Sequence, residues 1–250
     1  MKIEMESVGY HDGDTTLSGM FVTDADRTEP RPGVLVVHGG AGLDEHAKGR
    51  ARRMAALGYV AFACDMYGVG VPGNRERIVQ TIGALRAEPG RLARRASAGL
   101  DVLLRHPQVD GRIGAIGYCF GGLSVLELAR SGRALAGVVS VHGTLEASAR
   151  ATPGSIYTTI LVLHGSLDPH VPTAQVTGFA DEMRDAGADW YLIVYGGAQH
   201  GFKHETADGT RTPGVAYHAL ADERSSRAIA DFFSEVFGAA SQQAAPPPLR

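Results

Sequence analysis

The stretch RIGAIGYCFGGLSVLELARSG, residues 112–132, decides the fold. Its first part is a short apolar run of the kind that forms a buried strand, and its second part repeats apolar residues with helical spacing. Between them lies the sequence GYCFG, in which Gly117 and Gly121 stand two positions either side of Cys119. This pattern predicts a strand that turns sharply into a helix, with Cys119 exposed at the turn.

The rest of the chain repeats the alternation of strand and helix. Strands are expected at 33–40, 59–68, 135–143, 159–169 and 189–202, and helices at 47–58, 123–132, 173–187 and 216–237. Such alternation is typical of an α/β fold, with a mostly parallel central sheet and helices on both faces. We interpret residues 1–238 as a single domain, because a chain of 250 residues with 44% hydrophobic content can bury one sizeable core. Residues 239–250 are small, polar and proline-rich, which predicts a disordered tail.

Charge and composition limit the partners. A formal charge of −3 gives no basic field for nucleic acid, and the basic run at 91–95 is interpreted as a solvated helix face. The amino terminus lacks the apolar core of a secretory signal, and no apolar run is long enough to cross a bilayer. We therefore expect a cytoplasmic protein, a monomer or homodimer, that binds neither nucleic acid nor membrane. The two cysteines lie far apart in the sequence and are interpreted as free thiols.

The turn at Cys119 predicts a nucleophile. The helix that follows directs its positive end toward the sulfur, which favours the thiolate. In this strand, turn and helix arrangement an acid and then a histidine follow the nucleophile, each after a later strand. Asp168 closes the strand ILVLHGSLDP, and His200 follows the strand WYLIVYGGAQH. The order predicts a triad in which His200 takes the thiol proton and Asp168 fixes the histidine tautomer.

Backbone donors for an oxyanion are expected beside this triad. One usually comes from the residue after the nucleophile and another from a glycine-containing loop after an early strand. The candidates are the amides of Phe120 and Gly40. Other residues flank the same motifs or end a strand nearby, and we expect the substrate to contact Gly39, Tyr118, His142, Phe202 and His204.

Four segments, in the same order, resemble those of the dienelactone hydrolases. They are HGGAGLDEHAKGRARRMAALGYVAFACDMYG at 38–68, GYCFGG at 117–122, HGSLDPHVP at 164–172 and GGAQHGF at 196–202. The resemblance implies an α/β-hydrolase fold with Cys119, Asp168 and His200 as the triad and with Gly40 and Phe120 as the oxyanion donors. It also implies hydrolysis of a small ester or lactone through an acyl-cysteine, without a metal or organic cofactor.

One departure from the family concerns the resting cysteine. Family members commonly carry a glutamate beside it, in the loop after the early strand, where this chain has Gly39. If Cys119 is activated by deprotonation, the base is therefore expected to be His200, Asp44 or Glu45. The alternative is that the thiol has a different resting arrangement.

A second departure concerns substrate charge. The best-known members hold a substrate carboxylate with arginines, but shortly after the histidine this chain has Lys203 and His204. Arg75 and Arg77 are other candidate cations. A general ester or lactone is thus a better expectation than dienelactone itself.

Alternatives remain at several positions. Cys64 lies in an apolar strand and is expected in the core. His142 is either a pocket residue or a simple loop residue. Cys119, His200 and Asp168 are all possible zinc ligands, although the turn favours a nucleophile. The rival function is a catalytically silent scaffold with a redox-sensitive or ligand-binding thiol at Cys119, and a third possibility is thioester cleavage.

Overall fold

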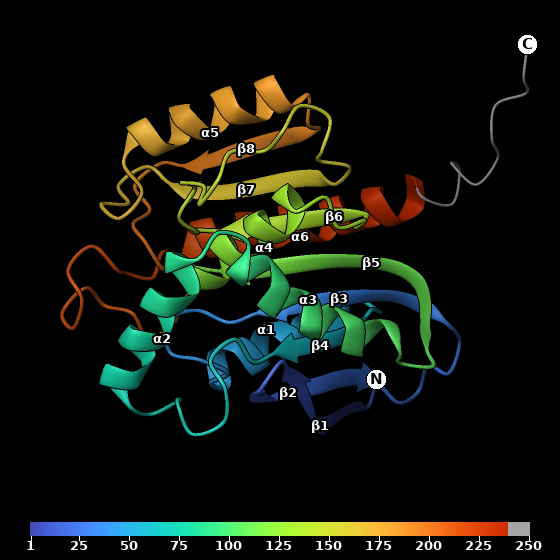
Figure 1. Ribbon diagram of the computed structural model, residues 1–250. Coiled ribbons are helices and arrows are strands. Elements are labelled where there is room, and N and C mark those ends of the chain that lie inside the picture. Colours follow the sequence, from blue (N-terminus) through green and yellow to red (C-terminus); the bar gives the residue numbers. More distant parts are fainter. Residues whose placement is uncertain (240–250) are drawn as a thin grey trace, which may run out of the picture.

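Eight strands form one mostly parallel sheet in the computed structural model, which describes residues 1–239 (Figure 1). The strands are β1 (Ile3–Asp12), β2 (Thr15–Asp24), β3 (Arg31–Val37), β4 (Val60–Cys64), β5 (Val109–Tyr118), β6 (Gly137–Val141), β7 (Thr159–Gly165) and β8 (Trp190–Tyr195). Their spatial order is β1-β2-β4-β3-β5-β6-β7-β8. The pairs β1/β2 and β2/β4 are antiparallel and the other pairs are parallel.

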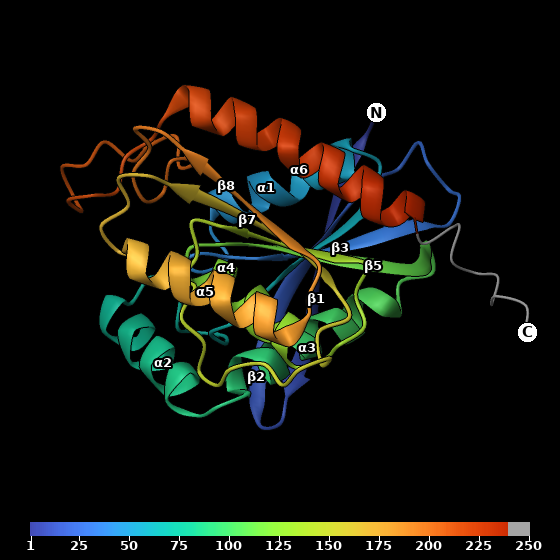
Figure 2. The same cartoon turned by 90° about the horizontal axis from the view of Figure 1, so that it is seen from above.

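Helices cover both faces of the sheet, so the predicted α/β fold is confirmed (Figure 2). One face carries α1 (Glu45–Ala56) and α6 (Ala219–Ala239), and the other carries α3 (Arg91–Leu104), α4 (Phe120–Arg130) and α5 (Thr173–Ala186), with α2 (Arg75–Ala87) outside α3. Two apolar clusters result. Because strand side chains alternate, Val34 and Val36 pack toward α1 and α6, whereas Leu35 and Val37 pack toward the other helices.

The amino-terminal hairpin was not among the expected strands. β1 and β2 are joined by Gly13 and Asp14, and Gly13 has a φ of 56°, a left-handed conformation that suits glycine. The hairpin turn also corrects the interpretation of the basic run at 91–95. Arg95 is buried, and its guanidinium donates to Asp12 Oδ2 at 2.5 Å and to the carbonyl of Met66 at 2.8 Å. That run is therefore only partly a solvated face.

The final helix begins and ends later than expected. α6 runs from Ala219 to Ala239, whereas the sequence pattern predicted 216–237. The predicted tail at 239–250 lies outside the described residues except for Ala239, which ends this helix. No helix within the described part of the chain is both long and apolar enough to span a bilayer.

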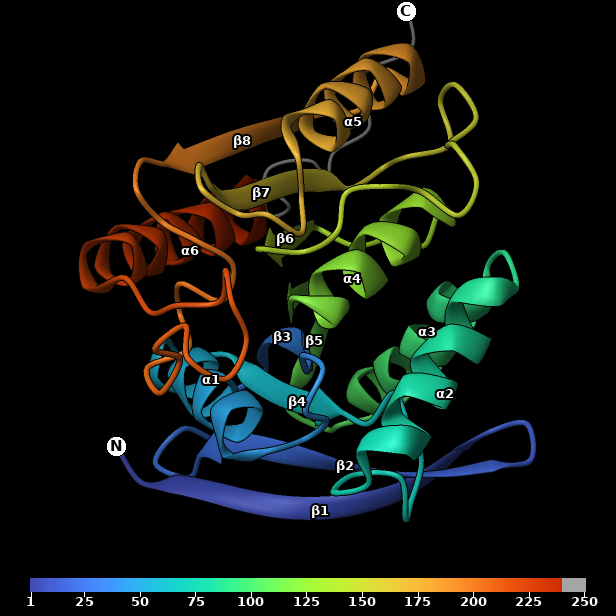
Figure 3. The ribbon, with the colours of Figure 1, turned by 90° about the vertical axis from the view of Figure 1, so that its left-hand side faces the viewer.

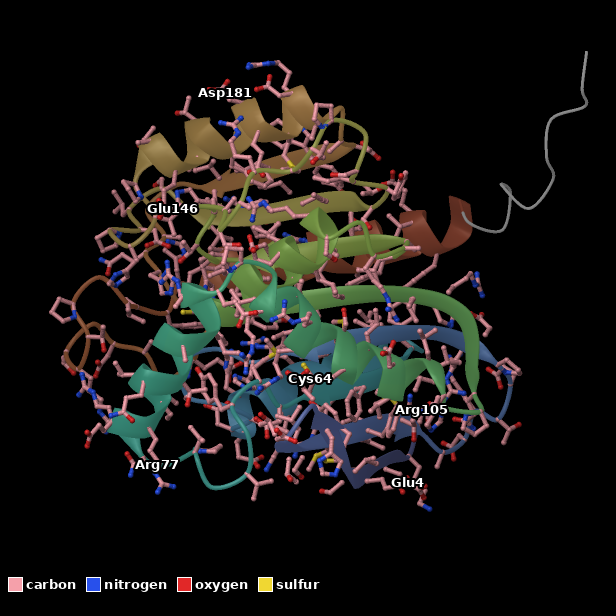
Figure 4. The ribbon with its side chains drawn as sticks, viewed as in Figure 1. Glu4, Cys64, Arg77, Arg105, Glu146 and Asp181 are labelled. Atoms are coloured by element: carbon pink, nitrogen blue, oxygen red, sulfur yellow. The ribbon has the colours of Figure 1, made fainter. Side chains whose placement is uncertain are left out.

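The two cysteines are free thiols in different surroundings. Cys64 is fully buried at the end of β4, beneath α3, as expected for a core residue (Figure 4). A Cβ built at Gly99 of α3 would lie 2.7 Å from the Cβ of Cys64, so the helix packs directly on it. Burial raises the pKa of the Cys64 thiol, which keeps it protonated and unreactive. Cys119 is only half-buried and follows β5.

The carboxyl edge of the sheet collects the segments of interest. The parallel strands β5, β6, β7 and β8 end on one side of the molecule, which faces the viewer in Figure 3. Cys119 and His142 directly follow β5 and β6, while Asp168 and His200 lie in the loops after β7 and β8. Loops at this edge bind ligands in open α/β sheets.

Candidate active site

Cys119 occupies a sharp turn between β5 and α4. Its φ is 53°, a strained conformation for a residue with a Cβ, and its amide donates to the carbonyl of Val141 at 3.0 Å. A Cβ at Gly117 would overlap the carbonyl oxygen of Gly121, and a Cβ at Gly121 would overlap that of Val37. Only glycine fits at these two positions, so the glycines permit the turn that presents the sulfur.

The structure brings the three predicted triad residues together. His200 Nε2 lies 3.1 Å from Cys119 Sγ, and His200 Nδ1 lies 2.8 Å from Asp168 Oδ2. The other carboxylate oxygen of Asp168 accepts hydrogen bonds from the amides of His170 at 2.8 Å and Val171 at 3.2 Å. The local turn thus fixes the carboxylate, and the carboxylate fixes the imidazole.

Electrostatics favour a charged pair of Cys119 and His200. Burial works to raise the pKa of the Cys119 thiol, but the hydrogen bond and charge of His200 outweigh it and lower the pKa. Burial works to lower the pKa of His200, but its hydrogen bonds to Asp168 and Cys119 raise it to about 10. For Asp168, burial is likewise outweighed by His200, which lowers the pKa of the carboxyl. The shifted pKa values of Cys119 and His200 both favour a thiolate beside an imidazolium.

Two backbone amides converge on the sulfur. The N–H groups of Phe120 and Gly40, the expected oxyanion donors, hydrogen-bond to Cys119 and also lower its pKa. Phe120 is the first residue of α4, so the positive end of that helix adds to the field at the thiolate. An oxygen that develops charge beside Sγ would meet the same two donors.

Two buried side chains hold the loop that carries Gly40. His38 is fully buried, and its Nε2 accepts a hydrogen bond from the amide of Met66 at 3.1 Å, so the ring proton is assigned to Nδ1. Nδ1 donates to the carbonyl of Gly39 at 2.7 Å, and the Tyr67 hydroxyl donates to the carbonyl of Gly40 at 3.1 Å. Because the carbonyls of Gly39 and Gly40 are held by these hydrogen bonds, the Gly40 amide stays directed at Cys119. Sequence reasoning gave neither residue this role.

The loop after His200 is anchored by Lys203. Its side chain is only 1% exposed, and Nζ donates to Asp222 Oδ1 at 2.5 Å and to the hydroxyls of Ser225 and Ser226, each at 2.8 Å. The guanidinium of Arg50 in α1 donates to the carbonyl of Lys203. Burial lowers the pKa of Lys203 to about 8, despite its pairing with Asp222. Lys203 therefore ties the loop to α6 and α1 and does not offer its charge to a substrate.

A cavity of about 450 Å³ opens over Cys119. Four of the five predicted contact residues line it, namely Gly39, Tyr118, His142 and His204. The fifth, Phe202, lies behind the wall; it is fully buried, with its ring 5.3 Å from that of His142. The expected contact between Phe202 and the substrate is therefore corrected: Phe202 packs behind His142 and supports it. The lining also includes side chains that the sequence did not single out as contacts, namely His46, His170, Thr212 and Val215.

The alternative bases for Cys119 are engaged elsewhere. The Asp44 carboxylate caps α1 by accepting from the amide of Ala47 at 2.9 Å, and Glu45 is exposed and paired with Lys48. Gly39 does lie beside the nucleophile, since a Cβ there would be 3.7 Å from that of Cys119. Of these candidate bases, His200 is the one that hydrogen-bonds to Cys119.

The candidate carboxylate-binding arginines do not reach the site. Arg75 and Arg77 both belong to α2, and neither lines the cavity. Arg77 is exposed at the outer side of the molecule and donates to the carbonyl of Gly70 at 3.2 Å (Figure 4).

The zinc alternative finds no support in the geometry. Cys119 and Asp168 bond opposite nitrogens of His200, so the three side chains do not converge on one point. Within residues 1–239, no group of three or more histidine, cysteine, aspartate or glutamate side chains is arranged to hold a metal ion.

A family model described as "Dienelactone hydrolase family" matches residues 17–237. The chain belongs to the dienelactone hydrolase family. The resemblance carried by the four sequence segments is therefore confirmed, and with it membership of a hydrolase family with an α/β-hydrolase fold.

Three relatives illustrate the match to this family. The crystal structure of a dienelactone hydrolase-like promiscuous phosphotriesterase from metagenomic libraries is 39% identical, with a TM-score of 0.89 over 95% of this chain and 100% of that one. An uncharacterized protein of Caenorhabditis elegans is 37% identical over 152 residues, which are 59% of this chain and 96% of that one. A relative from Escherichia coli O157:H7, provisionally named a carboxymethylenebutenolidase, is 27% identical over 84% of this chain and 79% of its own.

In this member of the dienelactone hydrolase family, the charged pair predicts how thiol reactivity depends on pH. Because His200 lowers the pKa of Cys119, alkylation by iodoacetamide is expected to have its inflection below the ordinary thiol value of about 9. In His200→Ala only burial and the two amides act on the thiol, so the inflection moves to higher pH. Intact mass measured after alkylation at pH 5–10 checks this, with peptide mapping to exclude Cys64. Superimposable profiles for the two proteins would contradict the assigned pair.

Proposed function

We propose that this protein is a cysteine-dependent hydrolase of small esters or lactones that works through an acyl-cysteine. The observation that carries the proposal is the continuous hydrogen-bonded row of Asp168, His200 and Cys119, which ends at the floor of a cavity. Two backbone amides directed at the sulfur complete what an acyl-transfer site requires.

The first half of the reaction forms the acyl-enzyme. The Cys119 thiolate attacks the carbonyl carbon, and the carbonyl oxygen takes the negative charge and accepts from the amides of Gly40 and Phe120. As the intermediate collapses, the bond to the leaving oxygen breaks and His200 Nε2 gives that oxygen its proton. An alcohol departs, or in a lactone the ring opens, and an acyl thioester remains on Cys119.

The second half releases the acid. A water molecule attacks the thioester carbonyl while neutral His200 accepts its proton at Nε2, and the same two amides hold the oxyanion. Collapse breaks the bond to sulfur, so the carboxylic acid leaves and the thiolate and imidazolium are restored. Asp168 keeps the other ring proton at Nδ1 throughout, which reserves Nε2 for the transfers.

A second activity is favoured by one relative. The structure that is 39% identical is described as that of a promiscuous phosphotriesterase. Attack of the Cys119 thiolate on a neutral phosphotriester would form a phosphorus–sulfur bond and break the bond to one ester oxygen, which would take its proton from His200 Nε2. Water activated by His200 would then cleave the phosphorus–sulfur bond and release the phosphodiester. The same two amides would hold the phosphoryl oxygen. We propose this as a side reaction of the same site.

The test is a search for the covalent intermediate. Purified protein is mixed with activated short-chain esters, lactones, a thioester and a neutral phosphotriester, while turnover and intact mass are followed together. The expected result is turnover with one acyl group added at Cys119, and no adduct in Cys119→Ala. Neither turnover nor an adduct across the panel would favour the rival reading, a silent scaffold with a reactive thiol.

A further inference from the structure

His142 presents an imidazole that the proposed reaction does not use. It follows β6 at the carboxyl edge of the sheet, lines the cavity and is 4% exposed. Neither ring nitrogen has a hydrogen-bond partner within the described residues. Buried polar atoms are nearly always paired, because leaving one unpaired costs free energy, so two such atoms in a side chain that lines a cavity call for a partner that the described residues do not supply.

The ring is held rigidly. His142 has a φ of 41°, and its amide donates to the carbonyl of Leu163 at 2.8 Å. Its ring meets Phe202 edge to face, with centroids 5.3 Å apart, and lies 5.0 Å from the ring of His200. The side chain is therefore fixed beside the reacting groups before any ligand arrives, as a recognition group needs to be.

The imidazole is also uncharged. Burial, followed by the neighbouring charge of His200, lowers the pKa of His142 well below its usual value. A neutral imidazole has one donor and one acceptor nitrogen, so it pairs with a hydroxyl or carbonyl and gives a carboxylate no charge.

The rest of the cavity lacks a counter-charge for an anionic substrate. No lysine or arginine is among the described residues that line it. Lys203 is turned away onto Asp222, and the Arg50 guanidinium bonds the Lys203 carbonyl. The lining does include Asp44, whose negative charge would disfavour a second carboxylate nearby.

We propose that His142 is a specificity-determining residue that hydrogen-bonds an uncharged polar group of the substrate, so that the site prefers neutral esters or lactones bearing a hydroxyl or carbonyl near the scissile bond. This rests on the proposed function and names its substrate class. The polar group lies within reach of a ring that neighbours both His200 and Tyr118, on either the acyl or the alcohol side of the ester.

Four esters separate these possibilities. Phenyl acetate has no extra polar group, phenyl hydroxyacetate carries a hydroxyl on the acyl side, 3-(hydroxymethyl)phenyl acetate carries one on the alcohol side, and 3-carboxyphenyl acetate carries a charge. Each kcat/KM is divided by the rate of hydroxide-catalysed hydrolysis, which removes differences in intrinsic reactivity. Wild-type protein is expected to favour one hydroxylated ester over phenyl acetate by about 3- to 10-fold, the worth of one neutral hydrogen bond, and to disfavour the carboxylated one.

Two variants at His142 isolate the nitrogens. His142→Asn tolerates the left-handed backbone, and His142→Phe keeps a ring against Phe202; both are expected to bring the selectivity ratio close to one. His11→Asn is the control, since His11 lies exposed in β1 and does not line the cavity. That variant is expected to keep the wild-type ratio.

The outcomes are distinct. A wild-type ratio retained in His142→Phe, or a ratio near one in the wild type, would overturn the role of His142 while leaving ester hydrolysis intact. Preference for the carboxylated ester would overturn the neutral substrate class. No turnover of any ester and no acylation of Cys119 would overturn the proposed function and this inference with it.

Discussion

Cys119→Ala and His200→Ala are each expected to lower kcat for phenyl acetate hydrolysis by about 10⁴- to 10⁶-fold, and the double variant is expected to lose little more. The reason is that His200 bonds Sγ at 3.1 Å and lowers the pKa of Cys119, so removal of either partner removes the nucleophile of the proposed reaction. Initial rates at matched protein concentration, with circular dichroism to verify folding, measure the three losses.

The matched control for this prediction is the other cysteine. Cys64→Ala removes a thiol from the core beneath α3, away from the cavity lining, and is expected to keep kcat within about 2-fold while lowering stability modestly. Losses at Cys119 and His200 that multiply in the double variant would show that the two act independently. More than about a hundredth of wild-type turnover in Cys119→Ala would rule out the acyl-cysteine.

Arg130→Met is expected to cost about 3–5 kcal/mol of unfolding free energy, the largest stability effect that we predict. Arg130 in α4 lies between two buried carboxylates. It donates to Glu127 at 3.1 Å and to both oxygens of Glu182 in α5, at 3.0 and 2.8 Å, and each of the three side chains is 5% exposed. Loss of the guanidinium leaves two uncompensated negative charges in the interior.

Thermal and urea unfolding measure this cost, with a fall of roughly 6–20 °C in Tm expected for a chain of this size. Addition of Glu127→Gln and Glu182→Gln to Arg130→Met should restore much of the stability, because the charges are then gone. Arg184→Met is the control: it breaks an exposed ion pair with Asp181, also on α5, and should cost under about 1 kcal/mol. Equal effects of the two arginine substitutions would refute the argument from burial.

Local signals in the sequence were enough to predict that Cys119, Asp168 and His200 lie together. Gly117 and Gly121 specify the turn at Cys119, because no other residue fits there, and the positions of Asp168 and His200 after later strands follow from the parallel sheet. The structure brings these side chains into hydrogen-bond contact. The hairpin of β1 and β2 also had a local signal, the Gly13-Asp14 turn, which the interpretation of the sequence passed over.

The supporting residues left no such signal. The side chain of Lys203 meets α6 about twenty residues later in the chain, and the Arg50 that bonds its carbonyl lies 153 positions away. Arg95 belongs to a basic run whose composition indicates a solvated surface, and only the packing of the hairpin turn on α3 buries it. Phe202 lies two residues from His200 but points into the core. Such contacts arise from the tertiary arrangement and have no fixed spacing.

The anchoring of Lys203 changes how variants of this protein should be interpreted. The ammonium group of Lys203 links the loop after His200 to α6. Substitutions in α6 can therefore disturb proton transfer by His200 even where they make no contact with a substrate. In a random library screened for activity, hits in α6 would then report on the alignment of the base. Engineering that seeks new substrates should leave that helix alone and work on the cavity lining itself, around Tyr118 and His142.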